Sequence, residues 1–261
     1  MKHRIMIDTR GKKRDGDTPL VCTPLVGRTR ERVLAEAASV LGKKPDVIEW
    51  RVDHYTHIAD TADVLATAKA LRAAVGSTPL IFTCRAAADG GHKVPLDQEG
   101  IVALLEAVSA TRLVEFVSFE MSNAPALVQR LRASTKAHEV RLVLSYHNTA
   151  YTPGQDFMVD RLLEAEHLGA DVAMVQVMPR DAADVLTLLA AIARADAKAH
   201  IPLIGVSLGP LGAVSRMVGG LFGSGLSFAV GEKASAPGQI PISDLVTVLD
   251  IIRRARGGEM F

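Results

Sequence analysis

Charged side chains inside a buried strand are the first chemical signal in this sequence. Residues 46–53 read Asp-Val-Ile-Glu-Trp-Arg-Val-Asp, and strand alternation places Glu49, Arg51 and Asp53 on one face and apolar residues on the other. An enclosed charge needs a partner or a ligand. An arginine at a strand end is suited to binding a carboxylate, although a Glu49–Arg51 network that only stabilises the fold is an alternative.

Polar groups also follow the ends of the later apolar runs. Arg85 ends the third run, and Asp89 stands before two glycines, where an ordinary turn residue is the simpler interpretation. His147 closes the fifth run, as a candidate general acid or base or as a core histidine bonded to a carbonyl. Arg216 comes after the seventh run, and residues 231–239 form a polar, sharply turning loop.

These groups suit a small, hydroxylated, anionic substrate. No cluster of histidines and carboxylates has the spacing of a metal site, so we expect none. None of the ten lysines falls inside an apolar run; they lie in the leader, the helical segments and the loops.

Apolar runs typical of buried strands alternate with segments of helical period along the chain. Strands are predicted at 20–26, 46–53, 79–85, 113–121, 140–147, 170–178, 202–208 and 225–230. Helices are predicted at 28–41, 61–74, 98–110, 124–137, 156–168, 180–197, 212–221 and 242–255. Eight alternating units predict an α/β fold, a closed (β/α)₈ TIM barrel, whose chemistry lies at the carboxyl ends of the strands. An open doubly wound sheet is the alternative, but no GxGxxG motif follows the first strand.

Length and composition agree with one barrel domain. Residues 1–19 form a basic leader, in which 5–7 is a possible hairpin strand, and residues 20–261 form the barrel. A net charge of +1 does not resemble the basic surface of a nucleic-acid-binding protein. We expect no signal peptide, because the first residues are charged and include no long apolar stretch. No apolar run reaches about 18 residues, so we expect a cytoplasmic protein without a membrane contact. Cys22 and Cys84 lie in apolar runs and are predicted to be buried thiols.

Five motifs, in order and on the expected barrel elements, resemble those of the type I 3-dehydroquinate dehydratases of the shikimate pathway of aromatic amino acid biosynthesis. The motifs are Glu49-Trp50-Arg51, Phe82-Thr-Cys-Arg85, Ser145-Tyr-His147-Asn148, Ser215-Arg216 and Ser235-Ala-Pro-Gly-Gln239. The resemblance extends from Pro19 to about Arg254. Each motif is weak alone, but the set is highly specific.

The resemblance implies a homodimeric barrel, a lyase that converts 3-dehydroquinate to 3-dehydroshikimate and water without a metal or organic cofactor. In that family a lysine on the sixth strand forms a Schiff base with the C3 ketone. A histidine, here His147, removes a C2 proton and then helps the C1 hydroxyl leave. A glutamate supports the histidine, and Asp89, one methylene shorter, stands in its place. The implied substrate-binding residues are Glu49, Arg51, Arg85, Arg216, Ser235 and Gln239.

The family's Schiff-base lysine is replaced in this sequence. Met174 occupies the lysine position between Gly169-Ala170-Asp171 and Val177-Met178-Pro179. A thioether cannot form an iminium or stabilise negative charge on a facing oxygen. Three explanations stay open: a deliberate lysine-to-methionine replacement that holds substrate non-covalently, a natural paralogue with lost or altered chemistry, or a substitute lysine such as Lys233 or Lys93.

Two other function classes are consistent with such a barrel. One is a non-catalytic protein that binds a shikimate-type hydroxy acid. The other is a phosphate-binding aldolase or isomerase, which predicts a phosphate at the last two strand-to-helix loops. The lack of a lysine in any predicted strand argues against a Schiff-base aldolase.

Overall fold

The computed structural model describes residues 18–257, so the possible hairpin strand at 5–7 lies outside the described residues. The strands are β1 (Leu20–Leu25), β2 (Val47–Arg51), β3 (Leu80–Thr83), β4 (Phe116–Glu120), β5 (Arg141–Asn148), β6 (Val172–Val177), β7 (Leu203–Ser207) and β8 (Leu226–Phe228). The helices are α1 (Arg30–Leu41), α2 (Thr61–Val75), α3 (Gln98–Thr111), α4 (Pro125–Ala137), α5 (Gln155–His167), α6 (Ala182–Asp196), α7 (Gly209–Val218) and α8 (Ile242–Gly257). Short 3₁₀ helices are η1 (Val52–His54), η2 (Ala87–Asp89) and η3 (Gly219–Phe222).

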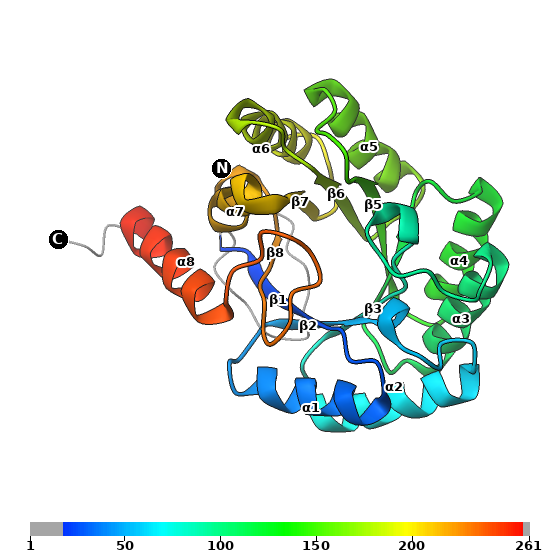
Figure 1. Cartoon of the computed structure of the whole chain (residues 1–261). Helices are drawn as coiled ribbons and strands as arrows, with labels where there is room; N and C mark the ends of the chain where they lie inside the picture. Colours follow the sequence, from blue (N-terminus) through cyan, green and yellow to red (C-terminus); the bar gives the residue numbers. More distant parts are fainter. Residues whose placement is uncertain (1–17, 258–261) are drawn as a thin grey trace.

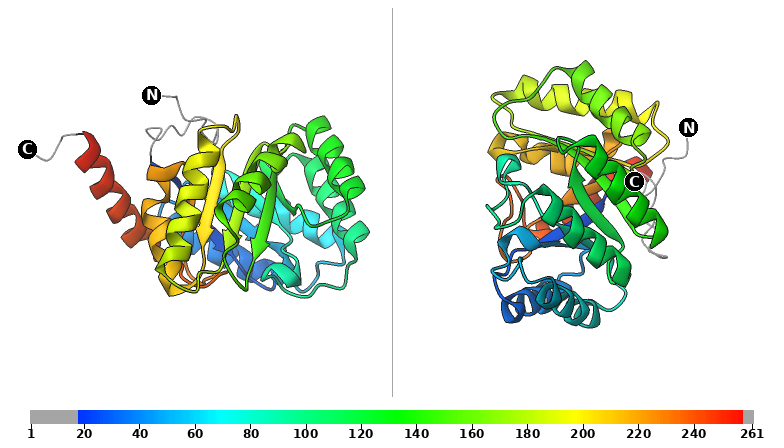
Figure 2. Two further views of the ribbon diagram at one scale, coloured as in Figure 1. Left: turned by 90° about the horizontal axis from the view of Figure 1, so that it is seen from above. Right: turned by 90° about the vertical axis from the view of Figure 1, so that its right-hand side faces the viewer.

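The strands form one parallel sheet in the order β7-β6-β5-β4-β3-β2-β1-β8. The sheet curls until its ends nearly meet, where the Gly225 N–H donates to the carbonyl of Leu203 on β7 at 2.8 Å. The helices surround this barrel, as Figures 1 and 2 show. The predicted (β/α)₈ barrel is therefore confirmed, and the open doubly wound sheet is wrong.

Strand alternation separates two apolar clusters. Outward residues such as Trp50 and Phe82 pack against the helices, while Phe116 and Met174 belong to the cluster inside the barrel. Cys22 and Cys84 are free and buried, as predicted. Side chains fill the barrel interior, and the cavity described below lies where the strands end.

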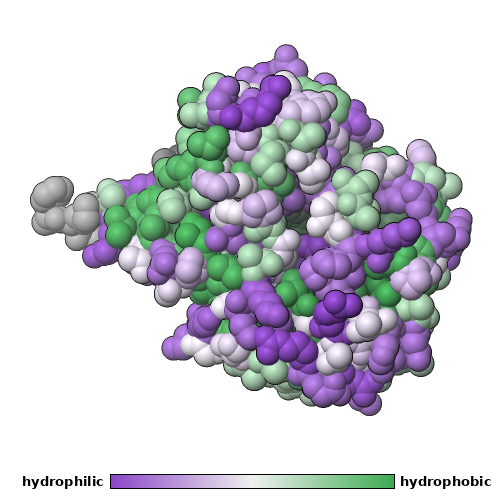
Figure 3. Space-filling view, in the orientation of Figure 1, coloured by the Kyte–Doolittle hydropathy of each residue, from purple (hydrophilic) through white to green (hydrophobic). Residues whose placement is uncertain are grey.

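Helix α8 extends away from the barrel, in red in Figure 1. Only its first half is packed closely, through Leu245 and Leu249. Exposed apolar side chains occur on α7, η3 and α8, and this side of the molecule is strongly hydrophobic in Figure 3. These residues are Leu211, Val214, Leu221 and Ile251. Among residues 18–257, no helix is both long and apolar enough to cross a membrane.

Candidate active site

A cavity of about 250 Å³ opens at the carboxyl ends of the strands. Eight of the nine predicted site residues line it: Glu49, Arg51, Arg85, Asp89, Met174, Arg216, Ser235 and Gln239. They come from β2, β6 and α7 and from the loops after β3 and β8. Half of the residues that line this cavity were therefore predicted from the sequence, and their chemical roles stay predictions.

Glu49 and Arg51 of β2 do not bond to each other, so they do not form the fold-stabilising network that was the alternative interpretation. Arg51 bonds Asp53 through two parallel contacts, Nε to Oδ1 at 2.8 Å and Nη2 to Oδ2 at 2.9 Å. Glu49 instead accepts from the hydroxyl of Thr83 at 2.7 Å. Strand β2 also ends at Arg51, and Asp53 lies in η1, where a strand to residue 53 was predicted. This turn brings Asp53 back onto the Arg51 guanidinium.

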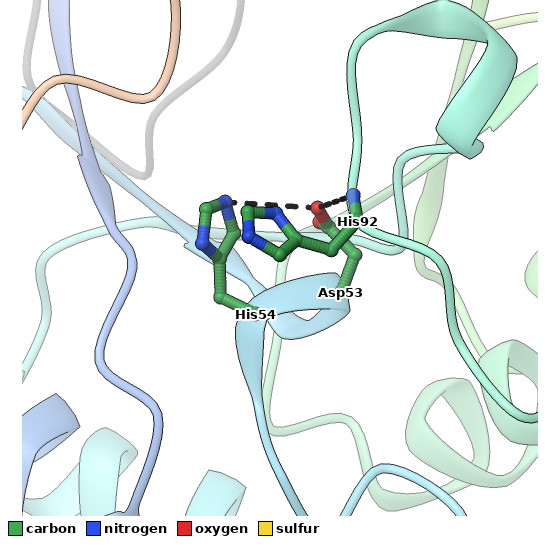
Figure 4. Close-up of side chains that lie close together, drawn as sticks. All are labelled: Asp53, His54 and His92. Carbon is green, nitrogen blue, oxygen red and sulfur yellow. Dashed lines mark hydrogen bonds and ion pairs between the residues drawn. The ribbon is translucent and has the colours of Figure 1, made fainter.

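Asp53 joins the end of β2 to the loop after β3. Its Oδ1 also accepts from the Arg85 N–H at 3.2 Å, and its Oδ2 from the His92 N–H at 3.1 Å. The rings of His54 and His92 lie 4.0 Å apart between centroids, beside this carboxylate (Figure 4). Because Arg51 and two amides occupy both oxygens, the arrangement positions Arg51 and the loop and leaves little room for a metal ligand. Neither His54 nor His92 was predicted to be a site residue.

Burial makes His54 a neutral imidazole. Its side chain lies 3.7 Å, Nε2 to Oδ2, from Asp53. Burial lowers the pKa of His54 to about 4, although the Asp53 charge opposes the shift. His54 therefore stays uncharged near neutral pH.

Arg85 is held in the barrel by a residue that sequence reasoning missed. Its Nη1 donates to Glu120 Oε1 at 2.6 Å and to the Ser145 hydroxyl at 3.0 Å. Glu120 closes β4 and also accepts from the Ala86 N–H at 3.2 Å. The signal was present, because Glu120 ends an apolar run just as Arg85 and His147 do. Glu120 fixes the guanidinium and compensates its charge.

His147 lies on β5 but is not among the residues lining the cavity. It is 9% exposed, and neither ring nitrogen has a hydrogen-bond partner among residues 18–257. In the sheet it is paired in register with Gln176 of β6. Burial, with help from the charges of Arg85 and Arg51, lowers the pKa of His147 well below 6.5. The imidazole is therefore neutral and carries an unused lone pair, as a general base requires.

Asp89 lies in a tight turn at the cavity. Gly90 follows it with a φ of 87°, and a Cβ on Gly91 would approach the carbonyl oxygen of Arg85 to 1.9 Å. Both glycines are therefore required by the backbone, and the predicted turn is confirmed. Burial and the negative charge of Glu120 raise the pKa of Asp89, against the effect of Arg85. Pairing between Asp89 and His147 stays a prediction.

Met174 lies on β6, facing the cavity. It is 4% exposed and packs within the apolar cluster of the barrel interior. No lysine is present among the described residues that line this cavity. Lys93 and Lys233 are both exposed and lie outside its lining.

The last loop is folded onto Arg216. The guanidinium donates through Nε to the Gly238 carbonyl at 2.9 Å, and through Nη1 and Nη2 to the carbonyls of Phe228 and Pro237. Within the loop, Gln239 accepts from the Ser235 N–H at 3.0 Å and donates to its hydroxyl at 3.3 Å. Burial lowers the pKa of Arg216 to about 10, so it stays charged at neutral pH.

Comparisons with known proteins agree with this geometry. The model of the family described as type I 3-dehydroquinase matches residues 21–256. The 3-dehydroquinate dehydratase of Albidiferax ferrireducens is 49% identical over 242 residues, which cover 93% of this chain and 92% of that protein. The crystal structure of 3-dehydroquinate dehydratase from Geobacillus kaustophilus superposes with a TM-score of 0.90 at 41% identity, covering 91% of this chain and 92% of that one.

A more distant similarity shows the fold alone. The structure of a 3-hexulose-6-phosphate synthase superposes with a TM-score of 0.58 at 16% identity. The family model and the relatives above 40% identity, in contrast, cover more than nine-tenths of the chain. The chain therefore belongs to the type I 3-dehydroquinase family.

Proposed function

We propose that the cavity binds 3-dehydroquinate and is the site of a Schiff-base 3-dehydroquinate dehydratase, a hydro-lyase, whose activity in this chain is impaired at Met174. The observation that carries the proposal is the convergence of Arg51, Arg85 and Arg216 on one cavity that also holds Ser235 and Gln239. Guanidinium groups suit a carboxylate, and hydroxyl and amide groups suit the hydroxyls of a cyclic acid.

Arg216 is the proposed partner of the substrate carboxylate. A guanidinium has five N–H groups, and three of those of Arg216 donate to backbone carbonyls. One N–H remains on each terminal nitrogen, which is the pair that a bidentate carboxylate needs. The same contacts hold the loop that carries Ser235 and Gln239, so charge recognition and loop position depend on one side chain.

The family's reaction needs a lysine and assigns both proton transfers to His147. A lysine amine adds to the C3 ketone and water leaves, which gives an iminium. His147 then takes a proton from C2, and the electrons of that C–H bond move into the iminium to form an enamine. The enamine expels the C1 hydroxyl, which leaves as water with a proton from His147. Hydrolysis of the iminium releases 3-dehydroshikimate and restores the amine.

With methionine at position 174, the first step, condensation of an amine with the C3 ketone, cannot take place there. Its thioether has no N–H to condense with a ketone, and it offers no positive charge to an enolate oxygen. The remaining groups that would bind the acid are present, so the same observation favours a second candidate, a barrel that binds a shikimate-type acid without converting it. We propose that this chain still binds the acid although its catalytic activity is impaired.

Calorimetric titration with 3-dehydroquinate, paired with an assay for 3-dehydroshikimate, tests the proposal. We expect saturable binding and little or no product. Absence of binding would remove 3-dehydroquinate as the ligand. Rapid product formation by the unmodified chain would show that Met174 does not impair it.

We expect Arg216→Ala to weaken the binding of a quinate-type acid about tenfold or more, because a charge-assisted bidentate contact is lost. An analogue without the carboxylate should lose much less affinity. The comparison of the two ligands cancels the effect of a loosened loop, since that effect acts on both. Titration calorimetry measures both losses, and equal losses would assign the carboxylate to another arginine, with Arg51 and Arg85 next.

We propose a homodimer, as the resemblance implies. Leu211, Val214, Leu221 and Ile251 are between 41% and 53% exposed on neighbouring elements at the α8 side. Apolar patches of this kind in soluble proteins mark contact surfaces. A second copy of the chain would cover them, and sedimentation equilibrium at twice the chain mass is the expected result.

A further inference from the structure

Gln176 is a cavity residue without an assigned role. It stands two positions after Met174 on β6, and both side chains line the cavity. It is the only residue of β6 that is not fully buried. Its carboxamide makes no hydrogen bond to any residue of the described chain 18–257. A polar group placed on a cavity wall without a partner is available to a ligand.

The neighbours of Gln176 leave further hydrogen-bonding capacity unused. His147 is paired with Gln176 in the β5–β6 register, so the two side chains lie on the same face of the sheet. Both ring nitrogens of His147 are buried without a partner. A buried polar atom without a partner is unfavourable, because it has lost its hydrogen bonds to water. A ligand oxygen at this place would find donors and acceptors from two strands.

The other amide of the cavity is already occupied. Gln239 accepts from the Ser235 N–H and donates to the Ser235 hydroxyl. Arg85 and Arg51 are likewise engaged with Glu120 and Asp53. Among the described residues that line the cavity, Gln176 is therefore the one nearest in sequence to Met174 whose uncharged N–H group is available to a ligand.

We propose that the Gln176 carboxamide donates a hydrogen bond to the ligand oxygen that faces Met174. This inference rests on the proposed function, which places the C3 oxygen of a cyclic hydroxy acid opposite that position. Residues two apart on a strand are about 6.6 Å apart, a span that the flexible Gln176 side chain can bridge toward Met174. Gln176 thereby selects ligands with a carbonyl or hydroxyl at C3 and holds them without a covalent bond.

Replacement of Gln176 by methionine tests this contact, because methionine has nearly the same length and no amide. Titration of Gln176→Met with 3-dehydroquinate should show binding about five- to tenfold weaker than in the parent, the scale of one neutral hydrogen bond. An analogue in which hydrogens replace the C3 oxygen should bind the variant and the parent within twofold. Gln129→Met, at an exposed position of α4, is the matched control and should change neither affinity.

A second variant keeps the test valid if Gln176→Met does not fold. Gln176→Glu preserves the shape of the side chain but replaces the N–H donor by a carboxylate oxygen. It should weaken the binding of 3-dehydroquinate at least as much as Gln176→Met does. Unchanged binding of 3-dehydroquinate in both variants, or an equal loss for the two ligands, would overturn the inference. If the parent itself binds neither ligand, the proposed function fails instead.

Discussion

Replacing Met174 with lysine is expected to let borohydride trap 3-dehydroquinate on the chain and to raise the dehydration rate by at least about 10²–10³-fold, the scale of one well-placed electrophilic contact. The new amine would stand at a position that is 4% exposed, facing the cavity. Burial and the nearby arginines should lower the pKa of this amine, which leaves free amine to attack the ketone. Mass spectrometry after reduction detects the adduct.

A second methionine at the cavity provides the control for this experiment. Met178 follows the end of β6 and also lines the cavity, four residues after Met174. Met178→Lys adds an amine to the same cavity at a different depth, and it should give neither adduct nor product. An adduct on the unmodified chain would show that another lysine, such as Lys93 or Lys233, has taken over. Failure of Met174→Lys to give adduct or product would favour a natural paralogue with different chemistry.

In the Met174→Lys background, His147→Ala is expected to reduce turnover by about two orders of magnitude or more, the usual contribution of a general base. The barrel should remain folded, because His147 makes no hydrogen bond that the structure would lose. Steady-state kinetics and circular dichroism measure the two effects. His200→Ala, at an exposed site outside the cavity, should leave turnover unchanged. Turnover of His147→Ala within a few-fold of its parent would assign the proton transfer to another group.

The pH dependence of the Met174→Lys variant should carry the same signature. Since the pKa of His147 is lowered, the neutral base persists at acidic pH. The decrease of kcat/KM that protonation of His147 causes should therefore occur well below pH 6.5. The unfolded chain binds a proton on this histidine near pH 6.5, whereas the folded chain does not. The free energy of unfolding should therefore decrease as pH falls below 6.5, and His147→Ala should reduce that decrease.

Local pattern alone was enough to predict the barrel. Apolar runs and helical segments alternate eight times, and the predicted ranges differ from the observed ones mostly by one to three residues at each end. The largest strand-end difference that matters for the site is at β2, where the chain turns at residue 52. The contacts that stabilise this turn come from Arg85 and His92, more than 30 residues away, and no local pattern contains them.

Residue types at the strand ends, together with the family resemblance, identified eight residues that line the cavity, and the resemblance alone singled out Met174 among them. The sequence did not determine which partner each charged residue of the cavity binds. Arg51 pairs with Asp53 and Arg85 with Glu120, while Arg216 donates to the carbonyls of the last loop. It also did not single out Gln176, whose amide and the paired ring of His147 both lack a hydrogen-bond partner among residues 18–257. Pairing of buried charges and satisfaction of polar atoms depend on distances between separate strands, which only the closing of the barrel sets.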